Sequence, residues 1–120
     1  MHGVVVTKAF VRAAERAGMS ENDVDDLIDF VARNPMAGDE IRGTGGCRKL
    51  RLAGRGKGKS GGYRLITFFS GPDIPVFLIT MFSKGERADL SKAETNGLAS
   101  LTKELVREYS RRAVKTGERG

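Results

Sequence analysis

The chain has 120 residues, 39% of them hydrophobic, which is enough for one domain with a single core. It carries 21 Lys and Arg against 15 Asp and Glu, and the resulting net charge of +6 favours anionic partners such as nucleic acid or an acidic protein. Cys47 is the only cysteine and His2 the only histidine, which excludes an internal disulfide and argues against a metal site. No cofactor site is predicted.

Targeting and membrane signals are not found in the sequence. No apolar run approaches the roughly 18 residues of a membrane span, and the N-terminal residues lack the apolar core of a secretion signal. We therefore expect a cytoplasmic protein without a membrane partner. With no internal repeat and no long linker, residues 1–120 are predicted to form a single domain, with a flexible polar tail from about Val114.

Two helices are predicted near the N-terminus. Thr7 can cap the first, and Gly18 can end it in a left-handed turn. Its apolar stripe consists of Phe10, Ala13, Ala14 and Ala17. Ser20 and Asp23 form a possible capping box for the second helix, which Asn34 and Pro35 should end. The apolar positions of this helix are Val24, Leu27, Ile28 and Val31.

Three extended segments follow: "CRKLRLA", "GGYRLITFFS" and "PVFLITMFS". In the first, alternation places Lys49 and Arg51 on one face of a strand and Leu50 and Leu52 on the other. The short turn "GPDI" makes the second and third strands antiparallel neighbours, and the first pairs most economically with the second. These segments predict a three-stranded antiparallel meander.

A final long helix is predicted to begin at a capping box formed by Ser91 and Glu94. Its apolar stripe would consist of Leu98, Leu101, Leu105 and Tyr109. The order of helix, helix, three strands and helix predicts an α+β domain with a three-stranded or larger antiparallel sheet.

The loop "AGRGKGKSGG" matches the relaxed spacing of a phosphate-binding P-loop. A P-loop must lead into a helix, whose N-terminus faces the phosphates. Here Gly61 and Gly62 are followed by the strand-forming residues from Tyr63 to Ile66. We therefore reject the nucleotide-binding interpretation of this loop.

Positive charge is concentrated between Arg42 and Arg64, where the chain contains no acid. The eight basic residues of this segment are Arg42, Arg48, Lys49, Arg51, Arg55, Lys57, Lys59 and Arg64. Those of the loop can either bind phosphates or form a solvated hairpin tip. Those of the strands are held rigidly, which suits fixed positions in a chemical site.

Three motifs carry a family resemblance: "IRGTGGCRKLRL", "GKGKSGGYRLITFF" and "VFLITMFSKGERADLS". Together they resemble toxins of the RelE/ParE superfamily from type II toxin-antitoxin systems, specifically the HigB-like branch of the RelE family. The resemblance runs from about Lys8 to Arg112 and implies a RelE-like fold. It also implies a ribosome-dependent endoribonuclease that cuts mRNA without a metal, inhibits translation and is silenced by an antitoxin.

The resemblance implies roles for individual residues. Lys49 and Arg51 match basic residues that assist deprotonation of the RNA 2′-OH and bind the phosphate, and Arg64 matches the arginine that stabilises the phosphorane. Gly85 replaces an arginine of many relatives, and Leu90 stands where some relatives carry an aromatic that stacks on a base. Lys84 is therefore the first candidate for protonating the leaving group, and Lys59 is the second. The alternative for Lys84 is a surface ion pair with Glu86. Further RNA-binding candidates are Arg48, Arg55, Lys57 and Lys59.

The resemblance also implies partners and leaves other functions open. The expected partners are the ribosome, mRNA and a HigA-like antitoxin with a helix-turn-helix domain. The acidic residues between Glu21 and Asp29 can contact that antitoxin, although a solvated helix face is the simpler interpretation. One rival function is inhibition of DNA gyrase, as in ParE-like toxins, which would not need the cations on the strands. Another is a non-catalytic RNA-binding or ribosome-binding domain, although Tyr63 is the only aromatic among the basic residues.

Overall fold

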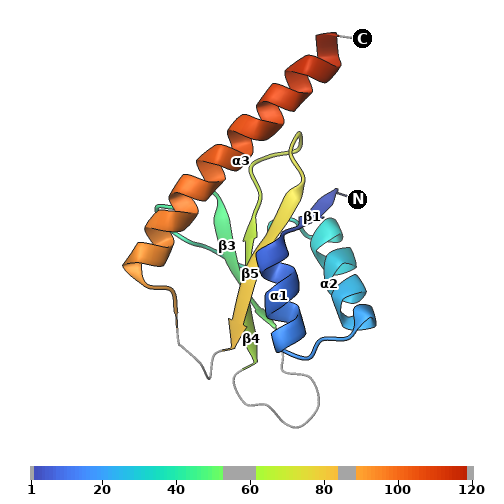
Figure 1. Ribbon diagram of the computed structural model, residues 1–120, viewed down its shortest axis with the longest axis vertical. Helices are drawn as coiled ribbons and strands as arrows, with labels where there is room; N and C mark the ends of the chain where they lie inside the picture. The colour runs from blue at the N-terminus through green and yellow to red at the C-terminus, as the bar shows by residue number, and fades with distance from the viewer. Residues whose placement is uncertain (1, 53–61, 84–88, 119–120) are drawn as a thin grey trace.

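The fold is built around a five-stranded sheet with the strand order β1-β5-β4-β3-β2 (Figure 1). The structure is a computed structural model that describes residues 2–52, 62–83 and 89–118, the last nine as backbone only. The strands are β1 (Val4–Val6), β2 (Asp39–Glu40), β3 (Cys47–Leu52), β4 (Tyr63–Phe68) and β5 (Val76–Ser83). The helices are α1 (Lys8–Arg16), α2 (Glu21–Arg33) and α3 (Lys92–Glu118).

Strands β3, β4 and β5 form the predicted antiparallel meander. Two short strands extend it at its edges. At one edge β2 pairs antiparallel with β3, and at the other β1 pairs with β5 in parallel, with Val4 opposite Val76. The sheet is therefore mixed rather than wholly antiparallel. The α+β class predicted from the sequence is confirmed.

Helices α1 and α2 cover one face of the sheet. The predicted caps are present: the Thr7 hydroxyl accepts a hydrogen bond from the Phe10 N–H at 3.1 Å, and Ser20 and Asp23 form a reciprocal capping box. The core beneath these helices contains Phe10, Ala13, Ala14, Leu27, Val31, Leu65, Val76, Leu78 and Met81. The apolar stripes of both helices thus anchor them on the sheet.

Helix α3 covers the other face, where its buried neighbours include Phe68, Phe77 and Ile79. Its capping box is confirmed, since the Ser91 N–H donates to Glu94 Oε1 at 2.8 Å and the Glu94 N–H donates to Ser91 Oγ at 3.1 Å. The helix extends to Glu118, beyond the predicted start of a tail at Val114. Within the described ranges, no helix is long and apolar enough to cross a membrane.

The predicted apolar stripe of α3 is wrong at one position. Leu101 is 38% exposed, whereas Thr102 is buried and its hydroxyl donates to the Thr44 carbonyl at 2.7 Å. This hydrogen bond turns the contact surface of α3 toward Thr102 and away from Leu101. Leu98, Leu105 and Tyr109 pack against the core as predicted.

One end of the sheet extends beyond α3. The helix runs upward and away from the end at which β4 begins and β5 finishes, in the lower part of Figure 1. The helix therefore does not extend over that end of the sheet in Figure 1.

Candidate functional site

Three predicted catalytic cations lie together on one face of the sheet. Arg51 of β3 is directly opposite Arg64 of β4 in the antiparallel register, and Lys49 precedes Arg51 by two positions. Their neighbours Leu50 and Leu65 pack beneath α1 and α2, so strand alternation directs the three cations to the opposite face. An open hollow of about 220 Å³, called here the cationic hollow, is lined by Asp39, Lys49, Arg51 and Arg64.

Arg64 is the most buried cation of the cationic hollow. Only 8% of the residue is exposed, and its Nη1 atom has no hydrogen-bond partner among the described residues. Leaving a buried charged donor unpaired is unfavourable. An anion that enters the hollow would compensate the charge of the guanidinium that lines it.

Lys49 is held by an acid from another part of the chain. Its Nζ atom donates to Asp89 Oδ1 at 2.9 Å, and the Leu90 N–H donates to the same oxygen at 2.8 Å. These hydrogen bonds, together with the positive charges of Lys49 and Arg64, hold the pKa of the Asp89 carboxyl below its usual value, against a smaller opposing effect of burial. The carboxylate is therefore ionised at neutral pH and competes with an anionic ligand for Lys49.

Asp39 is the second acid at the site, and Gly38 allows its position. Asp39 pairs with Lys49 across β2 and β3. A Cβ atom on Gly38 would lie 2.7 Å from the Lys49 carbonyl oxygen, and the residue has a φ of +96°. Glycine is therefore required for β2 to approach β3 closely enough for Asp39 to line the hollow.

Sequence reasoning missed both acids. Strand β2 has only two exposed residues, too few to show an alternating pattern. The capping box at Ser91 located the start of α3, but it gave no information on the contact between Asp89 and Lys49, which are 40 positions apart. The acidic component of the site therefore became visible only in three dimensions.

Arg48, predicted to bind RNA, is not part of the cationic hollow. Strand alternation places it on the face opposite Lys49, and its Nη1 atom donates to the Gly38 carbonyl at 3.1 Å. This hydrogen bond gives Arg48 a local structural role at the β2–β3 edge.

Several predicted site residues lie outside the described residues. They are Arg55, Lys57 and Lys59 of the glycine-rich loop, and Lys84 with its neighbours Gly85 and Glu86. Leu90 is described, and it packs against the core on the α3 side of the sheet. The strand that begins at Tyr63 directly after the loop agrees with the rejection of a P-loop.

The chemistry of the cationic hollow is that of an anion site. Its described lining contains no cysteine, serine or histidine that would serve as a nucleophile. Three cations and the two carboxylates of Asp39 and Asp89 leave one net positive charge around an unpaired donor. In the described ranges, no group of three His, Cys, Asp or Glu side chains forms a candidate metal site. Fixed cations of this kind bind phosphate and stabilise charge that develops on its oxygens.

Comparisons with known proteins place the chain in a family. A family model described as the RelE toxin of the RelE/RelB toxin-antitoxin system matches residues 3–117. The chain belongs to the RelE toxin family. The toxin of Escherichia coli RelE/RelB has been solved as a double arginine-to-alanine mutant in the free state, and this RelE structure is 18% identical to the chain. The alignment covers 84% of this chain and 96% of that chain, with a TM-score of 0.50. This likeness shows that the fold is RelE-like.

Membership of the RelE family makes the protein the toxin of a toxin-antitoxin system, whose partner is an antitoxin. The family resemblance inferred from the sequence motifs is thereby confirmed at the level of RelE. The assignment to the HigB-like branch stays a prediction.

Proposed function

We propose that the protein is a ribosome-dependent endoribonuclease that cleaves mRNA and so inhibits translation. The observation that carries this proposal is the buried guanidinium of Arg64, whose Nη1 atom is unpaired among the described residues in a hollow shared with Lys49 and Arg51. A toxin that acts only by binding a protein surface has no need of such a desolvated cation. Membership of the RelE family supports the same function.

The proposed reaction is an attack by the RNA 2′-oxygen on the adjacent phosphorus. The bond from phosphorus to the 5′-oxygen of the next nucleotide breaks, leaving a 2′,3′-cyclic phosphate. The proton of the 2′-OH passes to water, and the departing 5′-oxygen takes a proton from Lys84 or Lys59. Neither step requires a redox partner or a metal.

The residues of the cationic hollow have distinct proposed roles. Arg64 stabilises the negative charge that grows on the phosphoryl oxygens, because its fixed guanidinium charge lines the hollow that receives the phosphate. Lys49 and Arg51 bind the phosphate and assist deprotonation of the 2′-OH. Lys84, or else Lys59, protonates the leaving oxygen. The assignment of this role to either lysine rests on the sequence alone.

The proposed partners follow from the same function. The substrate is mRNA on the ribosome, and a HigA-like antitoxin with a helix-turn-helix domain blocks the toxin. Since the acids of the second helix are mostly exposed and Asp29 already pairs with Arg33 at 3.0 Å, a solvated face remains the simpler interpretation of that helix.

The test is to map new 5′ ends in transcripts after induction of the protein. We expect cuts within translated codons, and a loss on the order of 100-fold or more with Arg64→Ala, by analogy with removal of an oxyanion-stabilising donor. Arg48→Ala is the matched control, because it removes an arginine of β3 that lies on the other face of the sheet; it should leave the chemical step intact.

Other outcomes identify the rival functions. Growth arrest without cuts within codons would reject the nuclease, and DNA gyrase would then be assayed as the target of a ParE-like toxin. RNA or ribosome binding without cleavage, unchanged by Arg64→Ala, would instead support a non-catalytic binding domain.

A further inference from the structure

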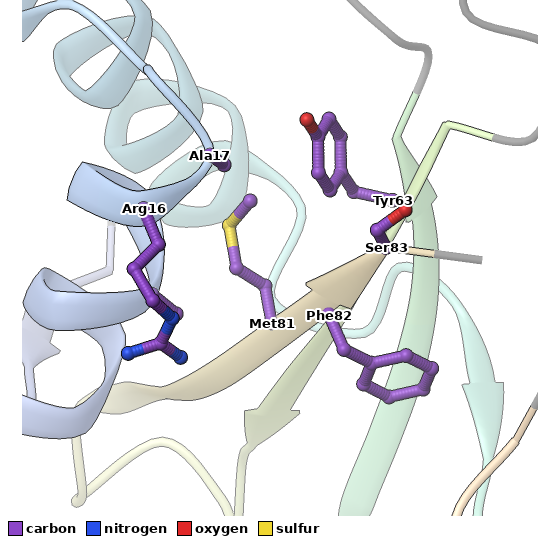
Figure 2. A pocket seen from close by; sticks show the side chains of 7 residues that line it. Arg16, Ala17, Tyr63, Met81, Phe82 and Ser83 are labelled. Carbon is purple, nitrogen blue, oxygen red and sulfur yellow. The ribbon is translucent and has the colours of Figure 1, made fainter. Parts of the chain in front are cut away.

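A second hollow lies on the opposite face of the sheet, next to the strand that carries Arg64 (Figure 2). Its volume is about 250 Å³. It is formed between the last turn of α1 and the adjoining ends of β4 and β5, and is lined by Ala13, Arg16, Ala17, Tyr63, Met81, Phe82 and Ser83. We call it the tyrosine hollow.

The tyrosine hollow exists because small residues face a large one. Ala13 of α1 and Ala17, the C-cap of that helix, are four residues apart and have only methyl side chains. Tyr63, the first residue of β4, lies opposite Ser83 of β5, and its side chain stands at the rim in Figure 2. Tyr63 is only partly buried. Its ring therefore does not fill the space between β4 and α1.

The lining combines a flat aromatic ring with a cation and an apolar floor. Arg16 is exposed and lies across the hollow from Tyr63, and no hydrogen bond or ion pair with another described residue holds it. The thioether of Met81 lies between them in Figure 2. Aromatic rings and guanidinium groups offer planar surfaces on which a nucleobase stacks, and a guanidinium also donates hydrogen bonds to base oxygens and nitrogens.

The position of Tyr63 connects the two hollows. Tyr63 and Arg64 are consecutive on β4, so their side chains lie on opposite faces at the same end of the sheet. In the cationic hollow no described lining residue is aromatic. The aromatic residue next to Arg64 in the chain is Tyr63, which is partly exposed at the start of β4.

We infer that the tyrosine hollow binds a nucleobase of the same RNA whose phosphate binds in the cationic hollow. This inference rests on the proposed function, since it takes the RNA at Arg64 as given. Stacking on Tyr63 and Arg16 tolerates several bases, while the size of the hollow and the groups around it favour some over others. The tyrosine hollow would thus contribute to the sequence preference of cleavage.

Binding is tested with fluorine NMR. The protein contains two tyrosines, Tyr63 and Tyr109, so incorporation of 3-fluorotyrosine gives two signals, and Tyr109 serves as an internal reference because it packs edge-on against Phe77 in the core. The probes are a 2′-deoxy trinucleotide with bases and its abasic counterpart, which carries the same phosphates. We expect the Tyr63 signal to move with the first probe and not with the second. Equal movement with both probes, or no movement, would overturn the inference.

Function is tested by mapping cleavage sites of variants. Tyr63→Leu should change base frequencies next to the cut and weaken binding of the base-bearing probe about tenfold, while Tyr63→Phe, which retains the ring, should retain the preference. Phe30→Leu, at an exposed aromatic of α2 outside both hollows, is the matched control. Unchanged base frequencies with Tyr63→Leu would reject a role in sequence preference.

The two proposals fail in different ways. If wild-type protein makes no cuts, the proposed nuclease function fails, and the NMR titration still decides whether the tyrosine hollow binds a base. If wild-type protein cuts mRNA while neither the fluorine signal nor the base frequencies respond, only the inference about the tyrosine hollow fails.

Discussion

Arg51 and Arg64 lie directly opposite each other across β3 and β4, with their side chains on the same face of the sheet. Like charges in this position repel and destabilise an antiparallel pair. The burial of Arg64 adds a further unfavourable contribution, because its Nη1 atom has no partner among the described residues. The site that we propose for catalysis is therefore expected to reduce the stability of the fold.

Arg64→Met should increase stability while it removes activity. Methionine fills the volume of the stem without a buried charge, and such replacements of buried charges are often stabilising. We expect the free energy of unfolding to rise by about 1 kcal/mol or more, measured by urea denaturation. Arg48→Met, which removes the donor to Gly38, should not stabilise the protein. A lower unfolding midpoint for Arg64→Met would show that the guanidinium is satisfied in the folded state.

Asp89→Asn should strengthen binding of RNA. The carboxylate holds the Lys49 ammonium at 2.9 Å, so its removal frees one cation for a phosphate. We expect a lower KM for cleavage and a steeper loss of affinity with salt, by about one counterion. The control is Asp29→Asn, which makes the same charge change at the ion pair with Arg33 on α2. An unchanged KM for Asp89→Asn, or equal effects of both variants, would refute direct competition at Lys49.

Lys57→Ala and Lys59→Ala test the cations of the glycine-rich loop, whose roles remain predictions from the sequence. If these lysines bind phosphates, each variant should bind RNA more weakly, and its RNA affinity should depend less on salt, by about one counterion. The rate of the chemical step should change little. Single-turnover cleavage at saturating protein separates the two effects. If Lys59→Ala instead cleaves RNA more slowly than wild type at saturating protein, the result would support a role of Lys59 in protonating the leaving group.

Cys47 should be unreactive in the folded protein. The side chain is fully buried, and burial raises the pKa of its thiol to about 11, so little thiolate forms at pH 8. Iodoacetamide should label the native protein far more slowly than protein unfolded in guanidinium chloride. Rapid labelling of the native state would contradict the burial of this strand residue.

The same thiol makes stability dependent on pH at the alkaline end. The pKa of the Cys47 thiol is higher in the folded protein than the value of about 8.5 expected in the unfolded chain. The contribution of this thiol to the free energy of unfolding is therefore complete below about pH 8.5 and is lost as the pH rises toward 11. Thermal unfolding between pH 8 and pH 11 should show this loss, and Cys47→Ala should lack that component of the decline.

Thr102→Val should destabilise the attachment of α3. Valine has nearly the shape of threonine but cannot donate to the Thr44 carbonyl in this buried contact. We expect a loss of about 1–3 kcal/mol in the free energy of unfolding. Thr102→Ser, which retains the hydroxyl, should lose less, and a larger loss for Thr102→Ser than for Thr102→Val would show that packing of the methyl group dominates.

Local signals predicted most of the fold. The caps at Thr7, Ser20 and Ser91 are short-range hydrogen bonds that the sequence specifies directly, and all three form. Alternation along β3 correctly separated Lys49 from Leu50. These features depend on neighbours within a few residues, which is why they could be recognised without coordinates.

Features that depend on distant partners could not be predicted. Strand β1 has only three residues, and its partner β5 is distant in the sequence. On α3, Thr102 is buried in place of Leu101 because its hydroxyl donates a hydrogen bond to Thr44, in the loop before β3. The contact of Asp89 with Lys49 likewise joins segments that no local pattern connects. The site could therefore be predicted in its cations and not in its acids.

The parallel pairing of β1 and β5 also sets when the toxin can fold during synthesis. Val4 pairs with Val76, and the Thr7 hydroxyl donates to the carbonyl of Ile79, 72 residues later in the chain. At about 5–20 residues per second, the first strand waits roughly 4 to 14 seconds for its partner to be translated. Lys49 waits a shorter time for Asp89, which follows it by 40 residues, but Asp89 is translated later than Ile79. The sheet of a nascent toxin therefore cannot be completed until its last strand has been synthesised, and this interval delays its activity.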